Sequence, residues 1–239
     1  FPNEYHAQIF PQFTAQDVLG QRHRGFLCPN RIEVREYLRN LIKDVCNRYE
    51  VEAIELDYVR YKRNREASEL PVLLFAGKYC YCEACRTQTG ASGLNWEEIT
   101  SSARQVLQTA EKVSLKEFRK MRELHRNAFD LVRFYVKYPI LARWLRFRED
   151  TITSFVTEVK ATIKSINQNI ELSADLFYPT LGWIVGQNYE DLGKALDSAK
   201  PMIYSAALGG WETGYLRSLH RNFADASEEE LIQFLNDTQ

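Results

Sequence analysis

The sequence lacks several features that would assign it to a specialised class of protein. Its formal net charge is -1, from 31 basic and 32 acidic residues, so no overall field favours binding to nucleic acid or anionic lipid. No apolar run reaches the roughly 18 residues that a membrane span needs. The sequence therefore predicts neither nucleic-acid nor membrane partners, and it leaves the oligomeric state and the compartment open.

Two further absences concern the start of the chain and its cysteines. The first residue is Phe1 and no basic and apolar leader follows it, so we expect that the chain has been cut, processed or excerpted. The 5 cysteines are an odd number, and three of them stand close together in Cys80-Tyr-Cys-Glu-Ala-Cys85. This distribution is not that of a small secreted domain held by disulfides.

The residues that are present indicate a globular α/β protein. The 239 residues are 45% hydrophobic and 26% charged, which is enough for one sizeable core. The segment 51–61 predicts a strand over 52–60 that alternates in character: Ala53, Glu55 and Asp57 lie on one face, and Ile54, Leu56 and Tyr58 lie on the other. An acidic inner face and an apolar outer face are typical of a strand in a parallel barrel, which helices cover from outside.

Capping signals and hydrophobic periodicity predict the other elements. A helix begins after Asn30, with Glu33 three residues on, and a short strand is possible over 5–10. Capping pairs at Asn95 with Glu98 and at Ser114 with Glu117 open a long helical region after a loop at 62–94. Pro139 should interrupt this region, and a further helix should run to about Ile166, with a buried face of Ile152, Phe155, Val156, Val159 and Ile163.

A second strand is predicted over 169–177, and it repeats the pattern of the first. Glu171, Ser173 and Asp175 lie on one face, while Leu172, Ala174 and Leu176 lie on the other. A short helix over 189–195 leads to a third strand at 200–205, and the chain closes with a helix at 226–235, capped by Asp225 or Ser227.

These elements predict an α/β fold of the (β/α)8 TIM-barrel type. An eight-stranded barrel typically needs roughly 250 residues, and a long insertion at 62–147, with a cysteine loop and helices, uses many of those available. We therefore expect a single domain over 1–239 that is an incomplete, central portion of a barrel. A doubly wound parallel sheet is the alternative.

Several motifs follow one another along the chain: Phe26-Leu-Cys-Pro-Asn30, Glu33-Val-Arg-Glu-Tyr37, Ile54-Glu-Leu-Asp-Tyr-Val-Arg60, Cys80-Tyr-Cys-Glu-Ala-Cys-Arg86, Ser173-Ala-Asp-Leu-Phe177 and Pro201-Met-Ile-Tyr204. In combination they resemble a family of hypothetical glycosyl hydrolases with amylase-superfamily-like TIM barrels. The resemblance covers roughly residues 20–210. It implies that strands before Phe1 and after Gln239 complete the same barrel.

Glycoside hydrolysis commonly needs two carboxyl groups, one that attacks or stabilises the anomeric carbon and one that protonates the leaving oxygen. Asp57 and Asp175 each close a polar row at the end of a strand, so they are the candidate pair across the barrel mouth. The resemblance implies that Asp57 is the nucleophile or stabiliser. Arg60 could keep Asp57 ionised, because a nearby cation lowers the pKa of a carboxyl group. Asp57 could instead only pair with Arg60, Asp175 could only cap a turn, and Glu212 is a rival acid.

Aromatic side chains near the strand ends are candidates for sugar binding, because flat rings stack on the apolar faces of sugars. Tyr58, Tyr204 and Trp211 are assigned to this role together with Arg60, although Trp211 could equally pack as a lid. Trp183 and Trp144 are interpreted as packing residues. Glu55 and Glu171, one layer deeper on the polar faces, are interpreted as partners of the catalytic groups.

The cysteine motif predicts a structural site. Cys80, Cys82 and Cys85 place three soft ligands within six residues, which suits a zinc ion, and Cys28 could be the fourth ligand. A disulfide from Cys28 to one of the three is the alternative, and Cys46 is interpreted as a core residue. We expect no cofactor for catalysis.

Taken together, the sequence predicts a glycoside hydrolase that acts on an oligo- or polysaccharide. A non-catalytic module that binds carbohydrate or has a structural role is the alternative. Metal-dependent hydrolysis would need an open metal position with Asp and His ligands, and the 4 histidines show no such spacing.

Overall fold

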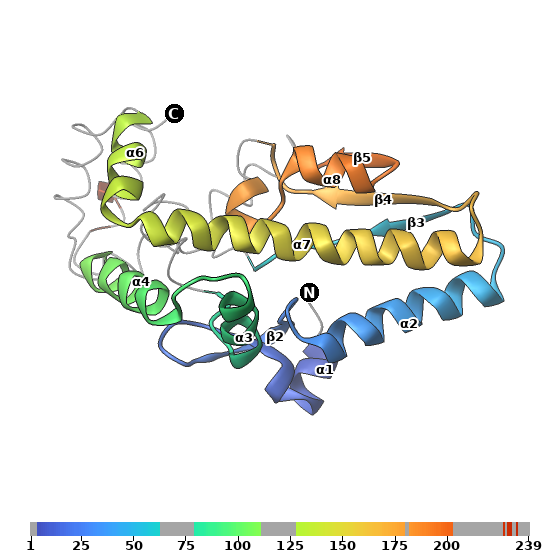
Figure 1. Cartoon of the computed structure of the whole chain (residues 1–239), viewed down its shortest axis with the longest axis horizontal. Helices are drawn as coiled ribbons and strands as arrows, with labels where there is room; N and C mark the ends of the chain where they lie inside the picture. Colours follow the sequence, from blue (N-terminus) through green and yellow to red (C-terminus); the bar gives the residue numbers. More distant parts are fainter. Residues whose placement is uncertain are drawn as a thin grey trace.

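The computed structural model describes residues 4–62, 79–110, 128–179 and 182–202, together with residues 227, 229, 230 and 233 (Figure 1). In chain order the elements are α1 (Glu4–Ile9), the 3-10 turn η1 (Pro11–Phe13), β1 (Thr14–Gln16), β2 (Arg22–Leu27), α2 (Ile32–Arg48), β3 (Ala53–Leu56), α3 (Glu83–Ala91), α4 (Trp96–Ala110), α6 (Ala128–Lys137), α7 (Pro139–Ile166), β4 (Glu171–Leu176), the 3-10 turn η3 (Gly182–Val185), α8 (Tyr189–Ala195) and β5 (Ser198–Pro201).

The central feature is a parallel sheet in the order β3-β4-β5. Ala53 pairs with Glu171 and Leu56 with Ala174, while Asp175 pairs with Lys200 on the other side of β4. A separate antiparallel pair, β1-β2, lies near the start of the chain. Parallel strands joined through helices confirm the predicted α/β class, and no closed barrel is present in the described ranges.

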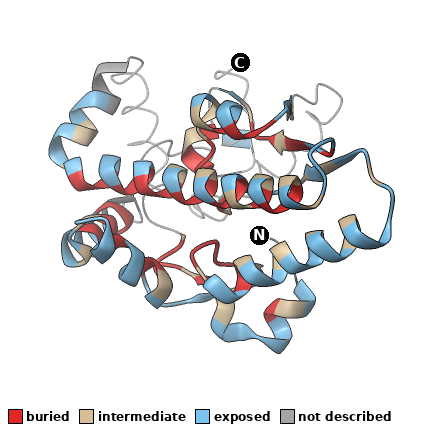
Figure 2. Cartoon of the chain, turned by 45° about the vertical axis from the view of Figure 1, so that its right-hand side comes forward, coloured by how far each residue is buried: buried red, intermediate tan, exposed pale blue. Residues whose placement is uncertain are grey.

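The apolar face of the sheet packs against α7. The buried core includes three apolar residues of β4, Leu172, Ala174 and Leu176, together with the apolar face of α7. The residues predicted for that face of α7 are all buried: Ile152, Phe155, Val156, Val159 and Ile163. Figure 1 shows α7 between the sheet and α2. Figure 2 shows buried positions along α7, whereas α2 is mostly exposed and buries only Val34.

Local sequence signals correctly predicted several helix ends. Pro139 separates α6 from α7 and occupies the first turn of α7, where a missing backbone N–H costs nothing. The side chain of Asn95 accepts a hydrogen bond from the Glu98 backbone at 3.1 Å, as the capping pair predicts. Ser227 and Glu230 likewise exchange capping hydrogen bonds, of 3.2 Å from the Glu230 N–H to the Ser227 hydroxyl.

Other expectations for single elements were wrong. Residues 5–9 belong to α1 rather than to a strand, because Glu4, Ala7 and their neighbours favour a helix and the Ala7 side chain is buried. The loop expected at 62–94 contains α3, while residues 63–78 lie outside the described ranges. The strand expected to reach residue 60 ends at Leu56, since Tyr58 takes a φ of 53° that no strand accommodates.

The sequence predicts that Asn30 caps α2, and this prediction is wrong. The helix begins at Ile32 with Arg31 at the capping position and no side-chain cap. The buried Asn30 side chain turns instead toward the phenol of Tyr61, which it reaches at 3.0 Å. A buried partner therefore replaces the local capping contact.

Among the described helices, none is both long enough and apolar enough to cross a membrane.

Candidate functional site

The carboxyl ends of the parallel strands bring Asp57 and Asp175 side by side. Leu56, the last residue of β3, pairs with Ala174 of β4. Asp57 directly follows β3 and Asp175 is the next residue of β4, and the charge of Asp57 acts on Asp175. Neighbouring strands lie about 4.8 Å apart, so this strand-end pair occupies adjacent strands rather than opposite sides of a barrel mouth. Asp57 is exposed and Asp175 is half-buried.

A row of polar side chains continues beneath the strand-end pair on the same face. The Lys200 ammonium pairs with the Glu55 carboxylate, reaching across β4. The Ser173 hydroxyl donates to the same carboxylate at 3.4 Å. The hydrogen bond from Lys200 lowers the pKa of Glu55, so Glu55 stays ionised below the pair.

The surroundings of Asp175 favour its protonated form. Burial raises the pKa of Asp175 above its usual value, and the negative charges of Glu55 and Asp57 raise it further, against the opposing charge of Lys200. A carboxyl group whose pKa is raised beside a second carboxylate is suited to the role of a general acid.

Arg60 belongs to the loop after β3 and contacts aromatic rings from the segments that follow both strands. Its guanidinium carbon is 4.6 Å from the ring centroid of Tyr58 and 5.4 Å from that of Phe177, and the side chain is buried. Tyr58 remains 39% exposed, so its outer ring face is open to a ligand. Arg60 therefore supports an exposed aromatic ring immediately after Asp57.

Gln187 is a residue that the sequence analysis missed. Its side-chain oxygen accepts the Phe177 N–H at 2.7 Å, and its amide nitrogen donates to the Val59 carbonyl at 3.2 Å. Val59 and Phe177 each lie two residues after a member of the strand-end pair. Gly186 directly precedes Gln187 and has a φ of 81°, a turn conformation that glycine adopts readily. No local pattern marks Gln187, because one of its partners is 128 positions away.

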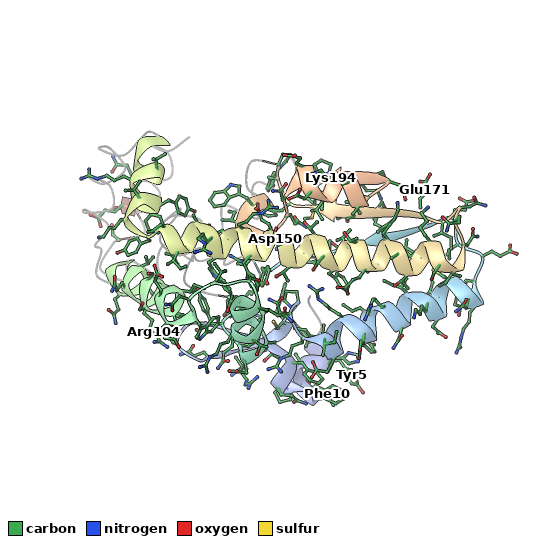
Figure 3. All side chains as sticks on the ribbon, in the orientation of Figure 1. Tyr5, Phe10, Arg104, Asp150, Glu171 and Lys194 are labelled. Atoms are coloured by element: carbon green, nitrogen blue, oxygen red, sulfur yellow. The ribbon has the colours of Figure 1, made fainter. Side chains whose placement is uncertain are left out.

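The structure describes some of the other aromatic and acidic residues singled out in the sequence, but not all of them. Trp183 is half-buried in η3, as expected for packing, and Trp144 is fully buried. Tyr204, Trp211 and Glu212 lie outside the described residues. Figure 3 labels Glu171 at the start of β4, the end of the strand away from Asp175.

The four predicted metal ligands come together in the core. The Sγ atoms of Cys28, Cys80, Cys82 and Cys85, here called the cysteine cluster, all lie within 4.8 Å of one another. All four side chains are buried, and the structure contains no disulfide between any of the five cysteines. Cys28 follows β2, whereas the other three flank the start of α3, so the cluster joins segments more than fifty residues apart.

A cavity of about 610 Å³ lies away from the strand ends. It is bordered by α2, α3 and α7, and none of its lining residues belongs to β3, β4 or β5. Asp150, labelled in Figure 3, and Arg146 contribute polar groups to its wall. The carboxylates of the strand-end pair do not face this cavity.

Solved structures that are similar to this one include the following two. The PgaB (BpsB) glycoside hydrolase domain from Bordetella bronchiseptica has 10% sequence identity and a TM-score of 0.49, over 88% of this chain and 52% of that chain. The beta-galactosidase from the psychrophilic Marinomonas ef1 has 15% identity and a TM-score of 0.47, over 85% of this chain and 29% of that chain. This chain thus spans about half of the first structure and less than a third of the second. No curated protein matches the sequence.

The sequence matches the family described as Glycosyl hydrolase-like 10 over residues 10–194. The matched stretch is more than half of the 239 residues and includes the strand-end pair and the cysteine cluster. It confirms the resemblance to glycosyl hydrolases on which the sequence analysis relied. The chain belongs to the Glycosyl hydrolase-like 10 family.

Proposed function

We propose that this chain carries the catalytic carboxylates of a glycoside hydrolase, with Asp57 as nucleophile and Asp175 as general acid. The observation that carries the proposal is the strand-end pair itself: two carboxyl groups on adjacent parallel strands, with the pKa of Asp175 raised. Membership of a glycosyl hydrolase-like family supports the same reaction class.

The spacing of the strands favours a retaining mechanism. Retaining glycosidases hold their two carboxyl groups about 5 to 5.5 Å apart, whereas inverting enzymes separate them by roughly 6.5 to 9.5 Å to admit a water. Side chains at the same level of neighbouring strands start about 4.8 Å apart. In the proposed mechanism Asp57 attacks the anomeric carbon while Asp175 protonates the leaving oxygen, and Asp175 then deprotonates the water that releases the sugar.

We also propose that β3, β4 and β5 are neighbouring strands of a (β/α)8 barrel. Parallel sheets are normally covered on both faces, but here one face carries Glu55, Asp57 and Lys200 in exposed positions. Helices of a doubly wound sheet would place apolar side chains against that face. A barrel interior that opens at a polar mouth accommodates these charges better, and its carboxyl end is where substrates bind.

The substrate in this proposal is an oligo- or polysaccharide that stacks on aromatic rings near the strand ends. Tyr58 is the described candidate, and Tyr204 and Trp211 remain candidates from the sequence. Glu212 remains a rival acid on the same grounds. A non-catalytic module that binds carbohydrate or has a structural role is the alternative, favoured by the position of the described cavity away from the strand-end pair.

Two substitutions and two classes of substrate separate the proposed roles. Aryl glycosides with a dinitrophenolate leaving group need little acid assistance, whereas unactivated saccharides need a proton from Asp175. We expect Asp175→Asn to lower kcat/KM by about 10²- to 10⁴-fold on unactivated saccharides and to leave kcat/KM on dinitrophenyl glycosides nearly unaffected, because this ratio reports the step in which the leaving group departs. The kcat on dinitrophenyl glycosides should fall, because Asp175 no longer deprotonates the water that releases the sugar. Asp57→Asn should abolish turnover of both classes, because both require the nucleophile.

Glu171→Gln is the matched control, since Glu171 lies on the same strand at the opposite end and is exposed. It should keep full activity on both classes of substrate. Full activity of Asp57→Asn would overturn the proposal. Saccharide binding by the unsubstituted protein without turnover of any substrate would instead support the non-catalytic module.

A further inference from the structure

The geometry of the cysteine cluster fits one metal ion. The Cys28 and Cys85 Sγ atoms are 3.6 Å apart, and those of Cys82 and Cys85 are 4.0 Å apart. Four sulfur atoms placed 2.3 Å from a central zinc ion form a tetrahedron with edges of about 3.8 Å. One of the two sulfur–sulfur distances is slightly shorter than this edge, and the other is slightly longer.

Neither a disulfide nor simple core packing fits the cysteine cluster as well as a metal ion does. A disulfide requires sulfur atoms about 2.05 Å apart, and the Cys28–Cys85 separation is well beyond that distance. Simple core packing does not require that Cys28 meet the three thiols of the 80–85 segment at a single point. Cys46 illustrates an ordinary packing cysteine: it is half-buried on α2 and takes no part in the cluster.

Hydrogen-bond donors surround the sulfur atoms. The Gln16 backbone donates to Cys80 Sγ at 3.3 Å and the Asn30 backbone donates to Cys28 Sγ at 3.4 Å. The Asn30 side-chain amide donates to Cys85 Sγ at 3.3 Å. Donors of this kind stabilise the negative charge of metal-bound thiolates and orient them.

A buried cation nearby provides a second, independent observation. Arg148 is 2% exposed, and among the described residues its Nε and Nη1 atoms have no hydrogen-bond partner. Its guanidinium carbon lies 4.5 Å from the ring centroid of Tyr61, whose hydroxyl receives the Asn30 amide that also contacts Cys85. A buried cation needs a compensating negative charge. A zinc ion with four thiolates carries a net charge of two minus and would supply it.

We infer that Cys28, Cys80, Cys82 and Cys85 bind one structural zinc ion as four thiolates. Four protein ligands leave no open position for water or substrate, so the ion stabilises the fold and takes no part in hydrolysis. Its structural effect extends to the loop after Asp57, because Asn30 connects Cys85 to Tyr61 and also accepts the Thr151 hydroxyl of α7 at 3.2 Å. The inference does not depend on the proposed glycosidase activity.

The test is metal analysis of the purified protein and of two variants in which one cysteine is replaced by serine. We expect elemental analysis to find one zinc ion per chain in the unsubstituted protein. Cys82→Ser should lose the metal, because a ligand is removed, while Cys46→Ser should keep all of it. Replacement of zinc by cobalt(II) should give the thiolate-to-cobalt absorption of a tetrahedral four-sulfur site.

A second measurement covers the case in which Cys82→Ser does not fold. Stepwise modification of the thiols of the unsubstituted protein by a mercurial should release zinc to a chelating dye only as the four buried thiols react, after Cys46. Protein that neither contains zinc nor takes up zinc or cobalt would overturn the inference. So would full zinc content in Cys82→Ser, a disulfide between two of the four cysteines, or iron in place of zinc.

Discussion

At the scale of single residues, Gln187 is the side chain that couples the two strand ends. It contacts the backbone two positions after Asp57 and two positions after Asp175, and it is 1% exposed. The Tyr189 hydroxyl adds a hydrogen bond of 2.5 Å to the Phe177 carbonyl of the same loop. The relative position of the two carboxyl groups therefore depends on a neutral side chain that is hydrogen-bonded to the backbone after both strands.

Replacement of Gln187 by leucine should destabilise the protein substantially. The Val59 carbonyl and the Phe177 N–H are buried and would lose these hydrogen bonds. A buried polar group that loses its partner costs roughly 1–3 kcal/mol, so we expect the free energy of unfolding to fall by about 2–4 kcal/mol. Urea unfolding measures the change.

Gln168→Leu is the control for this measurement. The Gln168 side chain is exposed and donates only to the Lys164 carbonyl at 2.8 Å. Its replacement should change the free energy of unfolding by no more than about 0.5 kcal/mol. Equal effects of the two substitutions would show that Gln187 has no special structural role.

Asp175 should give the protein a stability that depends on pH in a definite direction. Its pKa in the folded protein is raised above the usual 3.8, so above that pH the folded state binds more protons at this position than the unfolded state. Stability from this group therefore falls as pH rises from 3.8 through the folded pKa. Asp175→Asn removes the effect, and it should gain stability relative to the unsubstituted protein across that window.

The comparison is made by urea unfolding of both proteins at a series of pH values. Asp57→Asn serves as the control, because loss of one neighbouring negative charge should reduce the shift of Asp175 without abolishing it. A stability difference between Asp175→Asn and the unsubstituted protein that is independent of pH would contradict the raised pKa.

At the scale of secondary-structure elements, Arg35 joins α2 to α7. Its guanidinium pairs with Glu158 at 2.6 Å and donates to the Thr151 carbonyl at 2.8 Å, both on α7. It also donates to the Pro29 carbonyl at 2.7 Å, next to Cys28 of the cysteine cluster. Arg35, of which only 11% is exposed, thus links the helix before β3 to the helix before β4.

Arg35→Ala should therefore lower the free energy of unfolding by about 2–4 kcal/mol, because charge-assisted hydrogen bonds are lost and two backbone carbonyls lose a donor. Arg48→Ala on the same helix is the control. Arg48 pairs with Asp44 at 2.7 Å, but its side chain is 69% exposed, so the loss should stay below about 1 kcal/mol. Urea unfolding of both variants measures these changes in the free energy of unfolding. Similar decreases for Arg35→Ala and Arg48→Ala would refute the role given to Arg35.

At the scale of the whole molecule, the described chain arranges its chemistry on one side of the sheet and its buried polar contacts around α7. The polar face carries the strand-end pair, while the opposite face is covered by α7 and, beyond it, α2 (Figure 1). The cysteine cluster, Asn30, Tyr61 and Thr151 form a continuous set of contacts between β2, α3, α7 and the loop after β3. Structural stability and the candidate reaction centre are therefore connected through that loop.

The sequence by itself determined the elements whose signals lie within a few residues. Pro139 at the start of α7, Asn95 with Glu98 at the start of α4, the limits of α8 and the alternating faces of β3 and β4 follow from backbone sterics and side-chain periodicity. The three clustered cysteines near α3 also stood out, because their spacing alone marks a set of soft ligands.

Only the tertiary structure decided which distant residues meet. The adjacency of Asp57 and Asp175 depends on strand order, and the contacts of Gln187 join positions up to 128 residues apart. Asn30 followed a local capping pattern in the sequence, yet buried contacts with Tyr61 and Cys85 replaced the cap. Local sequence patterns indicate the conformation that each segment favours by itself. Packing in the folded chain can override that conformation, because burying an unpaired polar group costs more free energy than losing an exposed cap.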